Sequence, residues 1–171
     1  MAIELLREPP PPRWPEGASV RTYDSARDAR AVHRLLEEAF AGSQETISAF
    51  EDWRARMTGD PSFDPAVWFL AEAGGGLAGV ALCWKEGFVK DLAVHPAWRR
   101  RGLGEALLRQ ALGELFRSGV RVVALKVDSG NPTGAIRLYE RVGMSVDRRY
   151  RVYERRLSED PQLAFHMEVS Q

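Results

Sequence analysis

The chain has 171 residues, with 24 basic and 24 acidic side chains and a formal net charge of zero. This length fits one domain that buries its own core without disulfide or metal cross-links. The balanced charge argues against a nucleic-acid-binding or membrane-surface protein, because both classes usually carry a basic excess. Cys83 is the single cysteine, which excludes an intrachain disulfide and suits a reducing cytoplasm. The sequence contains no apolar run as long as a membrane span.

The N-terminal part of the sequence predicts an arm, a strand and two helices. Proline-rich residues 1–17 are expected to form an extended arm or linker ahead of the domain. A strand is predicted at 20–23, and Ser25–Asp28 has the spacing of a capping box at a helix start. A second helical stretch is predicted around 48–57. The apolar residues of the first helix recur at helical spacing and define its buried face: Val32, Leu35, Leu36, Ala39 and Phe40.

Strands dominate the middle of the sequence, and helices alternate with strands after it. Three strands are predicted in succession, at 67–71, 77–84 and 88–94. The turn Gly74–Gly76 favours a hairpin between the first two. The later elements are a helix, a buried strand, a helix and a final strand pair, at 105–117, 120–127, 131–142, 144–148 and 150–157. This order predicts a mixed α/β domain over residues 18–157, followed by a C-terminal tail at 158–171.

The most informative motif is Arg99-Arg100-Arg101-Gly102-Leu103-Gly104, between the strand at 88–94 and the helix at 105–117. Glycine lets the backbone approach an anion closely, and the N–H groups at a helix start favour negative charge. Arginine side chains at the same place add charge-assisted hydrogen bonds. The motif therefore predicts a site for a phosphorylated small molecule. A dinucleotide fingerprint is excluded because its third glycine would stand where the chain has Leu107, and no nucleoside-triphosphate P-loop pattern occurs.

Two motifs occur together in a defined order. The first is Leu92–Pro96 followed by Arg99–Gly104, and the second is Asn131 followed by the segment Leu138–Met144. With these motifs, the chain resembles the GNAT superfamily of acyl-CoA-dependent N-acetyltransferases over nearly all of the predicted domain. One spacing departs from the common pattern of that superfamily, since Asn131 lies eight residues before Tyr139 rather than seven.

The resemblance implies a GNAT-type fold. This is a mixed, mostly antiparallel sheet with a splayed pair of parallel strands, 88–94 and 120–127, flanked by about four helices. Trp14–Gly17 and Phe63–Pro65 look like the mycothiol-synthase-type members, which carry two such domains in tandem. The proline-rich start is similar to the linker before the second of those domains. This likeness assigns no substrate.

The resemblance also implies acetyl-CoA as the acyl donor, without a metal ion. The pyrophosphate would lie on the Arg99–Gly104 turn, and the pantetheine arm would pair with the strand at Leu92–Val94. A β-bulge near Ala93 would free a backbone N–H, that of Val94, to polarise the thioester carbonyl. The residues implied in cofactor binding are Leu92, Ala93, Val94, Arg99, Arg100, Arg101, Gly102, Leu103, Gly104, Glu105, Asn131 and Ala135.

Direct acetyl transfer to an amine needs a general base and a general acid. A primary amine with a pKa of about 10.4 is mostly protonated at neutral pH, so a base must remove a proton before attack. The leaving thiolate needs an acid, and Tyr139 holds the position of the family's general acid. Many members place a glutamate where this chain has Phe88, so the base is predicted as Glu86 at the open end of the strand. Asp91 is the other nearby carboxylate.

The predicted function is therefore acetyl transfer from acetyl-CoA to a primary amine of a small molecule or peptide. We expect a cytoplasmic monomer or homodimer without nucleic-acid or membrane partners, and Trp84 as a wall of the acceptor site. Phe88 in place of a glutamate keeps open a second hypothesis, a catalytically silent acyl-CoA-binding regulatory module. A third is a nucleic-acid-associated acetylation factor, suggested by basic and aromatic residues at 148–156. The arginine-rich, lysine-poor composition is associated with a GC-rich bacterial genome.

Overall fold

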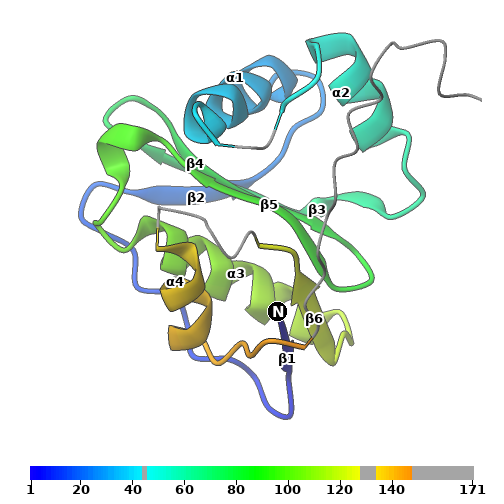
Figure 1. Ribbon diagram of the computed structural model, residues 1–171, viewed down its shortest axis with the longest axis vertical. Helices are drawn as coiled ribbons and strands as arrows, with labels where there is room; N and C mark the ends of the chain where they lie inside the picture. Colours follow the sequence, from blue (N-terminus) through cyan, green and yellow to red (C-terminus); the bar gives the residue numbers. More distant parts are fainter. Residues whose placement is uncertain (44–45, 128–133, 148–171) are drawn as a thin grey trace, which may run out of the picture.

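The computed structural model describes residues 1–43, 46–127 and 134–147, which form one six-stranded sheet with helices on both faces (Figure 1). The strands lie in the order β1-β6-β5-β4-β3-β2. Their bounds are Ala2–Glu4 (β1), Ser19–Thr22 (β2), Phe63–Ala73 (β3), Gly76–Trp84 (β4), Phe88–Val94 (β5) and Val122–Leu125 (β6). The described helices are α1 (Ala29–Phe40), α2 (Phe50–Thr58), α3 (Leu103–Arg117) and α4 (Ala135–Arg141), with a 3₁₀ turn at Pro96–Trp98. The predicted mixed α/β class with four flanking helices is confirmed.

Different helices cover the two faces of the sheet. In Figure 1, α1 and α2 lie on one side and α3 and α4 on the other. The apolar face of α3 is buried as its spacing predicts, through Leu103, Leu107, Leu108, Ala111, Leu112 and Leu115. On α1, Val32, Leu35 and Leu36 are buried, with Ala39 and Phe40 half-buried beside them. Full burial of each large apolar side chain stabilises the fold by about 1.5–3 kcal/mol, so these faces hold the layers together.

β5 and β6 form the one parallel pair among the described strands, and the pair is short. Phe88 pairs with Ala124 and Val89 with Leu125, after which β6 ends. β5 continues to Val94, and no described strand lies beside it on this side. The predicted splayed parallel pair is therefore confirmed. Residues 90–94 form what we call the open edge of β5.

The register shift in β5 lies at Lys90, and the predicted bulge near Ala93 is wrong. Asp91 pairs with Leu82 and Val89 pairs with Cys83, so Lys90 is the extra residue. Phe88 and Val89 pair with both β4 and β6, whereas residues 91–94 pair with β4 alone. The one-residue mismatch is therefore absorbed at the junction where β6 ends.

The N-terminal segment contributes to the sheet, which the sequence did not predict. Ala2–Glu4 pairs antiparallel with β6, and Ala2 exchanges two backbone hydrogen bonds with Ser145. Leu5 is 3% exposed, so residues 2–5 belong to the sheet and the core rather than to an arm. Of the predicted final strand pair, only residues 144–147 are described, with Ser145 in an isolated bridge. The other boundaries of the arm, the domain and the tail stay predictions.

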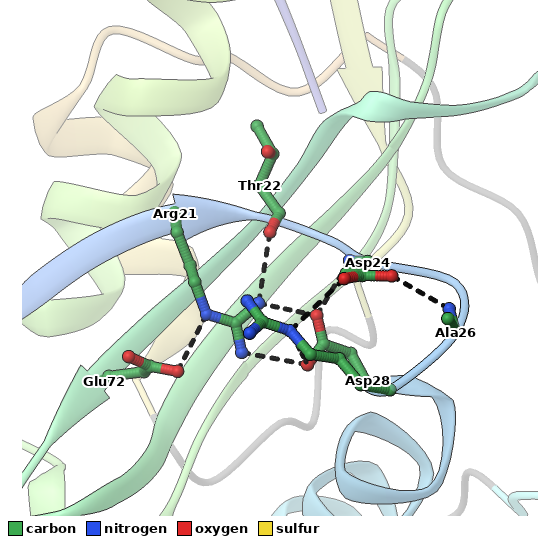
Figure 2. A network of polar contacts seen from close by, with 7 residues as sticks. Arg21, Thr22, Asp24, Ala26, Asp28 and Glu72 are labelled. Atoms are coloured by element: carbon green, nitrogen blue, oxygen red, sulfur yellow. Dashed lines mark hydrogen bonds and ion pairs between the residues drawn. The ribbon is translucent and has the colours of Figure 1, made fainter.

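The start of α1 is held by an ion-pair network rather than by the predicted capping box. Figure 2 shows Arg21 of β2 between Glu72 of β3 and Asp28, the residue before α1. Arg21 Nη2 donates to Asp28 Oδ1 over 2.9 Å, and its Nε donates to Glu72 Oε1 over 2.8 Å. The Asp28 carboxylate also accepts from the Asp24 N–H, so it does not cap the helix. Burial opposes ionisation of Asp28, but the hydrogen bonds from Arg21 and from the Asp24 N–H, with the charges of Arg21 and Arg27, together outweigh it and lower the pKa of this carboxyl.

Candidate active site

The glycine-rich turn opens directly into α3. Gly102 precedes the helix with a φ of 85°, a left-handed conformation that favours glycine. The first helical hydrogen bond runs from the Ala106 N–H to the Gly102 carbonyl over 3.0 Å. No side chain caps this end, so the N–H groups of residues 103–105 have no acceptor within the helix. They point outward at the positive end of the helix dipole, which is a suitable site for an anion.

The three arginines of the turn take different directions. Arg99 donates from Nη2 to the Ala39 carbonyl over 2.7 Å and from Nε to the Val94 carbonyl over 3.3 Å. The Arg101 guanidinium stacks on the Trp98 ring, 4.7 Å from its centroid. Arg100 has a φ of 63°, and its Nη1 lies 3.8 Å from where a Cβ on Gly134 would be. Arg100 therefore reaches the start of α4, while Arg99 ties α1 to β5.

The backbone of β5 presents donors along its open edge. The His95 N–H donates to the Ala78 carbonyl of β4 over 2.9 Å. Consecutive N–H groups of a strand point to opposite sides, so those of Val94 and Leu92 point away from β4. The N–H of Ala93 points toward β4. The two outward N–H groups lie beyond the end of β6 and are placed to pair with an extended ligand.

Tyr139 lies on α4, which packs against the start of α3. Its side chain is 7% exposed. Ala135 is the first residue of α4, and Asn131 lies outside the described residues. Glu105 of α3 binds Arg109 Nε at 3.0 Å and Arg141 Nε of α4 at 3.2 Å. Burial disfavours its charge, but these hydrogen bonds prevail and lower the pKa of Glu105, so its side chain joins the two helices.

A pocket of about 390 Å³ opens between α2 and the N-terminal part of the open edge. Its walls are Thr46, Ile47, Trp53, Arg56, Met57, Phe88, Lys90, Asp91 and Lys126. Glu86 is exposed on the turn between β4 and β5 and does not line this pocket, nor does Trp84. A larger hollow of about 650 Å³ lies between Pro9–Pro12 and α3 and contains no residue of β5. Of these two hollows, the pocket beside β5 is the one that adjoins the candidate site.

Asp91 is a buried carboxyl in the wall of this pocket. It is 8% exposed, and its Oδ1 lies 3.4 Å from Lys90 Nζ. Burial raises the pKa of Asp91 above its usual range, although Lys90 and Arg56 act in the opposite direction. Cys83 is fully buried behind it, and burial raises the pKa of that thiol to about 12. Cys83 is therefore a neutral packing residue, while Asp91 is a buried carboxyl with a raised pKa.

Two kinds of feature are not found in the described part of the chain. No three His, Cys, Asp or Glu side chains in residues 1–43, 46–127 and 134–147 gather as they would around a metal ion. None of the helices described there is both long and apolar enough to cross a membrane.

Residues 29–144 match the acetyltransferase (GNAT) family. This span runs from α1 to the residues after α4 and includes the open edge of β5, the α3 start and the pocket. The chain belongs to the GNAT family. The GNAT match therefore covers every element that forms the candidate site.

The GNAT relatives include proteins named mycothiol acetyltransferase. The one from Thermobispora bispora is 39% identical over an alignment of 171 residues, which covers 88% of this chain and 57% of the relative. The one from Geodermatophilus obscurus is 39% identical over 160 residues, covering 85% and 51%. The chain therefore spans about half the length of the relatives it matches.

Solved GNAT structures share the fold. A GCN5-related N-acetyltransferase from Sphaerobacter thermophilus superposes with a TM-score of 0.74 at 40% identity, over 84% of this chain and 46% of that one. A Salmonella typhimurium protein solved with its cofactor acetyl-CoA gives a TM-score of 0.60 at 21% identity, over 76% and 80%. At that identity the second likeness concerns the fold alone.

Proposed function

We propose that this GNAT domain transfers an acetyl group from acetyl-CoA to a primary amine. The observation that carries the proposal is the open edge of β5, which adjoins both halves of the candidate site. The Val94 side chain faces α3, because its Cγ2 lies 3.5 Å from where a Cβ on Gly104 would be. Asp91 lines the pocket on the face covered by α2. A donor along this edge thus has phosphate ligands at one end and an acceptor pocket at the other.

The residues present fit an elongated phosphorylated thioester. The uncapped N–H groups of residues 103–105 and the Arg100 guanidinium are donors for phosphate oxygens. The outward N–H groups of Leu92 and Val94 are donors for an extended arm and for the thioester oxygen. Acetyl-CoA, when bound, supplies an acetyl group already activated as a thioester. The chain contributes orientation and hydrogen bonds to the carbonyl oxygen.

Proton transfer is assigned to Tyr139 and to one carboxylate. Tyr139 protonates the leaving thiolate, because a phenol with a pKa near 10 gives up a proton to a thiolate at modest cost. Two carboxylates are candidates for the base that deprotonates the amine. Asp91 is the better placed, since it lines the pocket, whereas Glu86 lies on an exposed turn. Its raised pKa makes the ionised Asp91 a stronger base than an exposed aspartate.

The acceptor is a primary amine of a small molecule or peptide. The relatives are named for mycothiol, so mycothiol-type amines belong in the assay panel, although the chain spans only about half of those proteins. A monomeric or homodimeric state and a cytoplasmic location belong to the same proposal. The single free thiol of Cys83 supports that location, because a reducing compartment keeps free thiols reduced.

The second candidate is a silent acyl-CoA-binding module, favoured by Phe88 at the position where many members have a glutamate. Two measurements on the full chain separate the candidates: calorimetric titration with acetyl-CoA, and release of free thiol in the presence of an amine panel. Saturable binding with amine-dependent thiol release supports the acetyltransferase. Binding of acetyl-CoA without thiol release in the presence of any amine supports the silent module. Absence of binding overturns both.

A further inference from the structure

We infer that the amine acceptor carries an anionic group, a carboxylate or a phosphate, that binds three cations around the pocket. This inference rests on the proposed function and names its substrate class. The cations are Arg56 from α2, Lys90 from β5 and Lys126 from the residue after β6. We call these three residues the cationic rim. Lys90 and Lys126 are two of the three lysines in the whole sequence.

The charges of the rim are only partly balanced. Among the described residues, Asp91 is the one carboxylate in the pocket wall, and its Oδ1 lies 3.4 Å from Lys90 Nζ. The guanidinium of Arg56 donates to Ser48 Oγ over 3.3 Å and interacts with Asp91 through charge alone, without an ion pair to any described carboxylate. Lys126 is exposed and forms no ion pair with a carboxylate of the described residues. The described pocket wall therefore carries three cations against one carboxylate, in a chain whose formal net charge is zero.

This charge distribution selects between classes of amine. An acceptor with several ammonium groups would place positive charge beside the rim, where like charges repel. An acceptor with one amine and one anion satisfies both parts of the pocket: the amine lies beside Asp91 and the anion beside Arg56 and Lys126. A volume of about 390 Å³ suits a small molecule. The apolar walls formed by Trp53 and Met57 contact its carbon skeleton.

Matched amines test the inference. The full chain is assayed by thiol release with 4-aminobutyrate against 4-aminobutanamide, with O-phosphoethanolamine against ethanolamine, and with free amino acids against their amides. A hydrogen bond to a charged group stabilises by about 1.5–3 kcal/mol, so the anionic member of a pair should have a kcat/KM about tenfold higher or more. The pairs also distinguish a carboxylate from a phosphate. Equal rates within every pair, or faster neutral amines, overturn the inference.

Variants of the cationic rim show whether the pocket causes the preference for anionic amines. Arg56→Gln combined with Lys126→Gln should lower kcat/KM for the anionic amines about tenfold and leave the KM for acetyl-CoA unchanged. Arg54→Gln and Lys85→Gln remove exposed cations outside the pocket, and should keep the preference. A preference that survives the double variant, or a raised KM for acetyl-CoA alone, overturns the inference.

A binding measurement separates this inference from the proposed function. If no amine is acetylated, the same anionic amines are titrated calorimetrically into the chain with acetyl-CoA. Binding that is lost in the double rim variant supports the substrate class while the acetyltransferase proposal fails. No binding of any anionic amine overturns the substrate class.

Discussion

A Cβ on Gly104 would lie 3.0 Å from Leu138 Cδ1, so the absence of a side chain in the first turn of α3 permits the close approach of α4. The same Cβ would lie 3.5 Å from Val94 Cγ2 at the end of β5. Three elements of the candidate site thus meet at one glycine. Because Leu138 precedes Tyr139 on α4, this contact links the position of the proposed acid to that of the anion-binding turn.

Gly104→Val is expected to weaken acetyl-CoA binding at least about tenfold and to lower the free energy of unfolding by about 1–3 kcal/mol, because the added carbons overpack this contact. Calorimetric titration and thermal unfolding measure the two effects. Gly113→Ala is the matched control, since its Cβ meets only Arg117 Nη2 at an ordinary 3.6 Å. It should stabilise α3 by about 0.5–1 kcal/mol and leave acetyl-CoA affinity unchanged. Unchanged affinity in the Gly104 variant would contradict the assignment of this turn.

Arg100→Gly is expected to weaken acetyl-CoA binding without lowering the stability of the fold. Arg100 has a φ of 63°, a left-handed conformation that costs a side-chain-bearing residue about 1–2 kcal/mol. Glycine relieves this cost but removes a charge-assisted hydrogen bond to phosphate. Thermal unfolding should show equal or higher stability, while the Kd for acetyl-CoA should rise about tenfold or more.

Arg99→Met is the comparison for that variant. The Arg99 guanidinium is occupied by the Ala39 and Val94 carbonyls, so its loss should lower stability more than affinity. If Arg99→Met weakens acetyl-CoA binding more than Arg100→Gly does, the roles assigned to the two arginines are reversed.

Tyr139→Phe is expected to lower kcat about a hundredfold or more and to leave the Kd for acetyl-CoA within about twofold, because only the phenolic proton is removed. Presteady-state thiol release and calorimetry give the two values. Leu138→Ile, one position earlier on α4, controls for general disturbance of the helix. A kcat near that of the unmodified chain would reduce Tyr139 to a packing residue.

The sequence predicted the elements that depend on local spacing and missed those that depend on distant pairing. The α3 stripe from Leu103 to Leu115 follows from periodicity, the splayed pair of strands was implied by the resemblance to GNAT proteins, and both are present. β1 was missed because a segment of three residues is too short to show the alternating pattern of a strand, and the proline run that follows it predicts an extended arm. The bulge was misplaced because its position depends on where β6 ends, which is a property of the partner strand.

The pocket could not be predicted for a related reason. Arg56, Lys90 and Lys126 are each unremarkable in sequence, and only the sheet order and the packing of α2 bring them together. The same holds for Asp91, whose burial on the α2 face distinguishes it from Glu86. Sequence spacing placed both carboxylates near the strand but contained no information on which of them faces an acceptor.

Asp91→Asn and Glu86→Gln discriminate between the two candidate bases through pH. The base acts in its ionised form, and burial raises the pKa of Asp91. Activity should therefore fall on the acidic side at a pH above the usual aspartate pKa of about 3.9. Asp91→Asn should lower kcat/KM by about a hundredfold or more and abolish this acidic limb. Glu86→Gln should keep both the rate and the limb, and the opposite pattern would identify Glu86 as the base.

Stability provides the check that Asp91→Asn acts on chemistry rather than on folding. Because the folded-state pKa of Asp91 is raised, its protonated form favours the fold, and that contribution is lost as pH rises through the folded-state pKa. At neutral pH the charged carboxylate therefore destabilises its site, and a neutral asparagine removes this cost. Thermal unfolding at neutral pH should show the variant more stable, with the difference shrinking toward acidic pH. A variant that is slower yet more stable is the result expected of a base held ionised in a buried wall, whereas a variant that is slower and less stable would assign Asp91 a structural role.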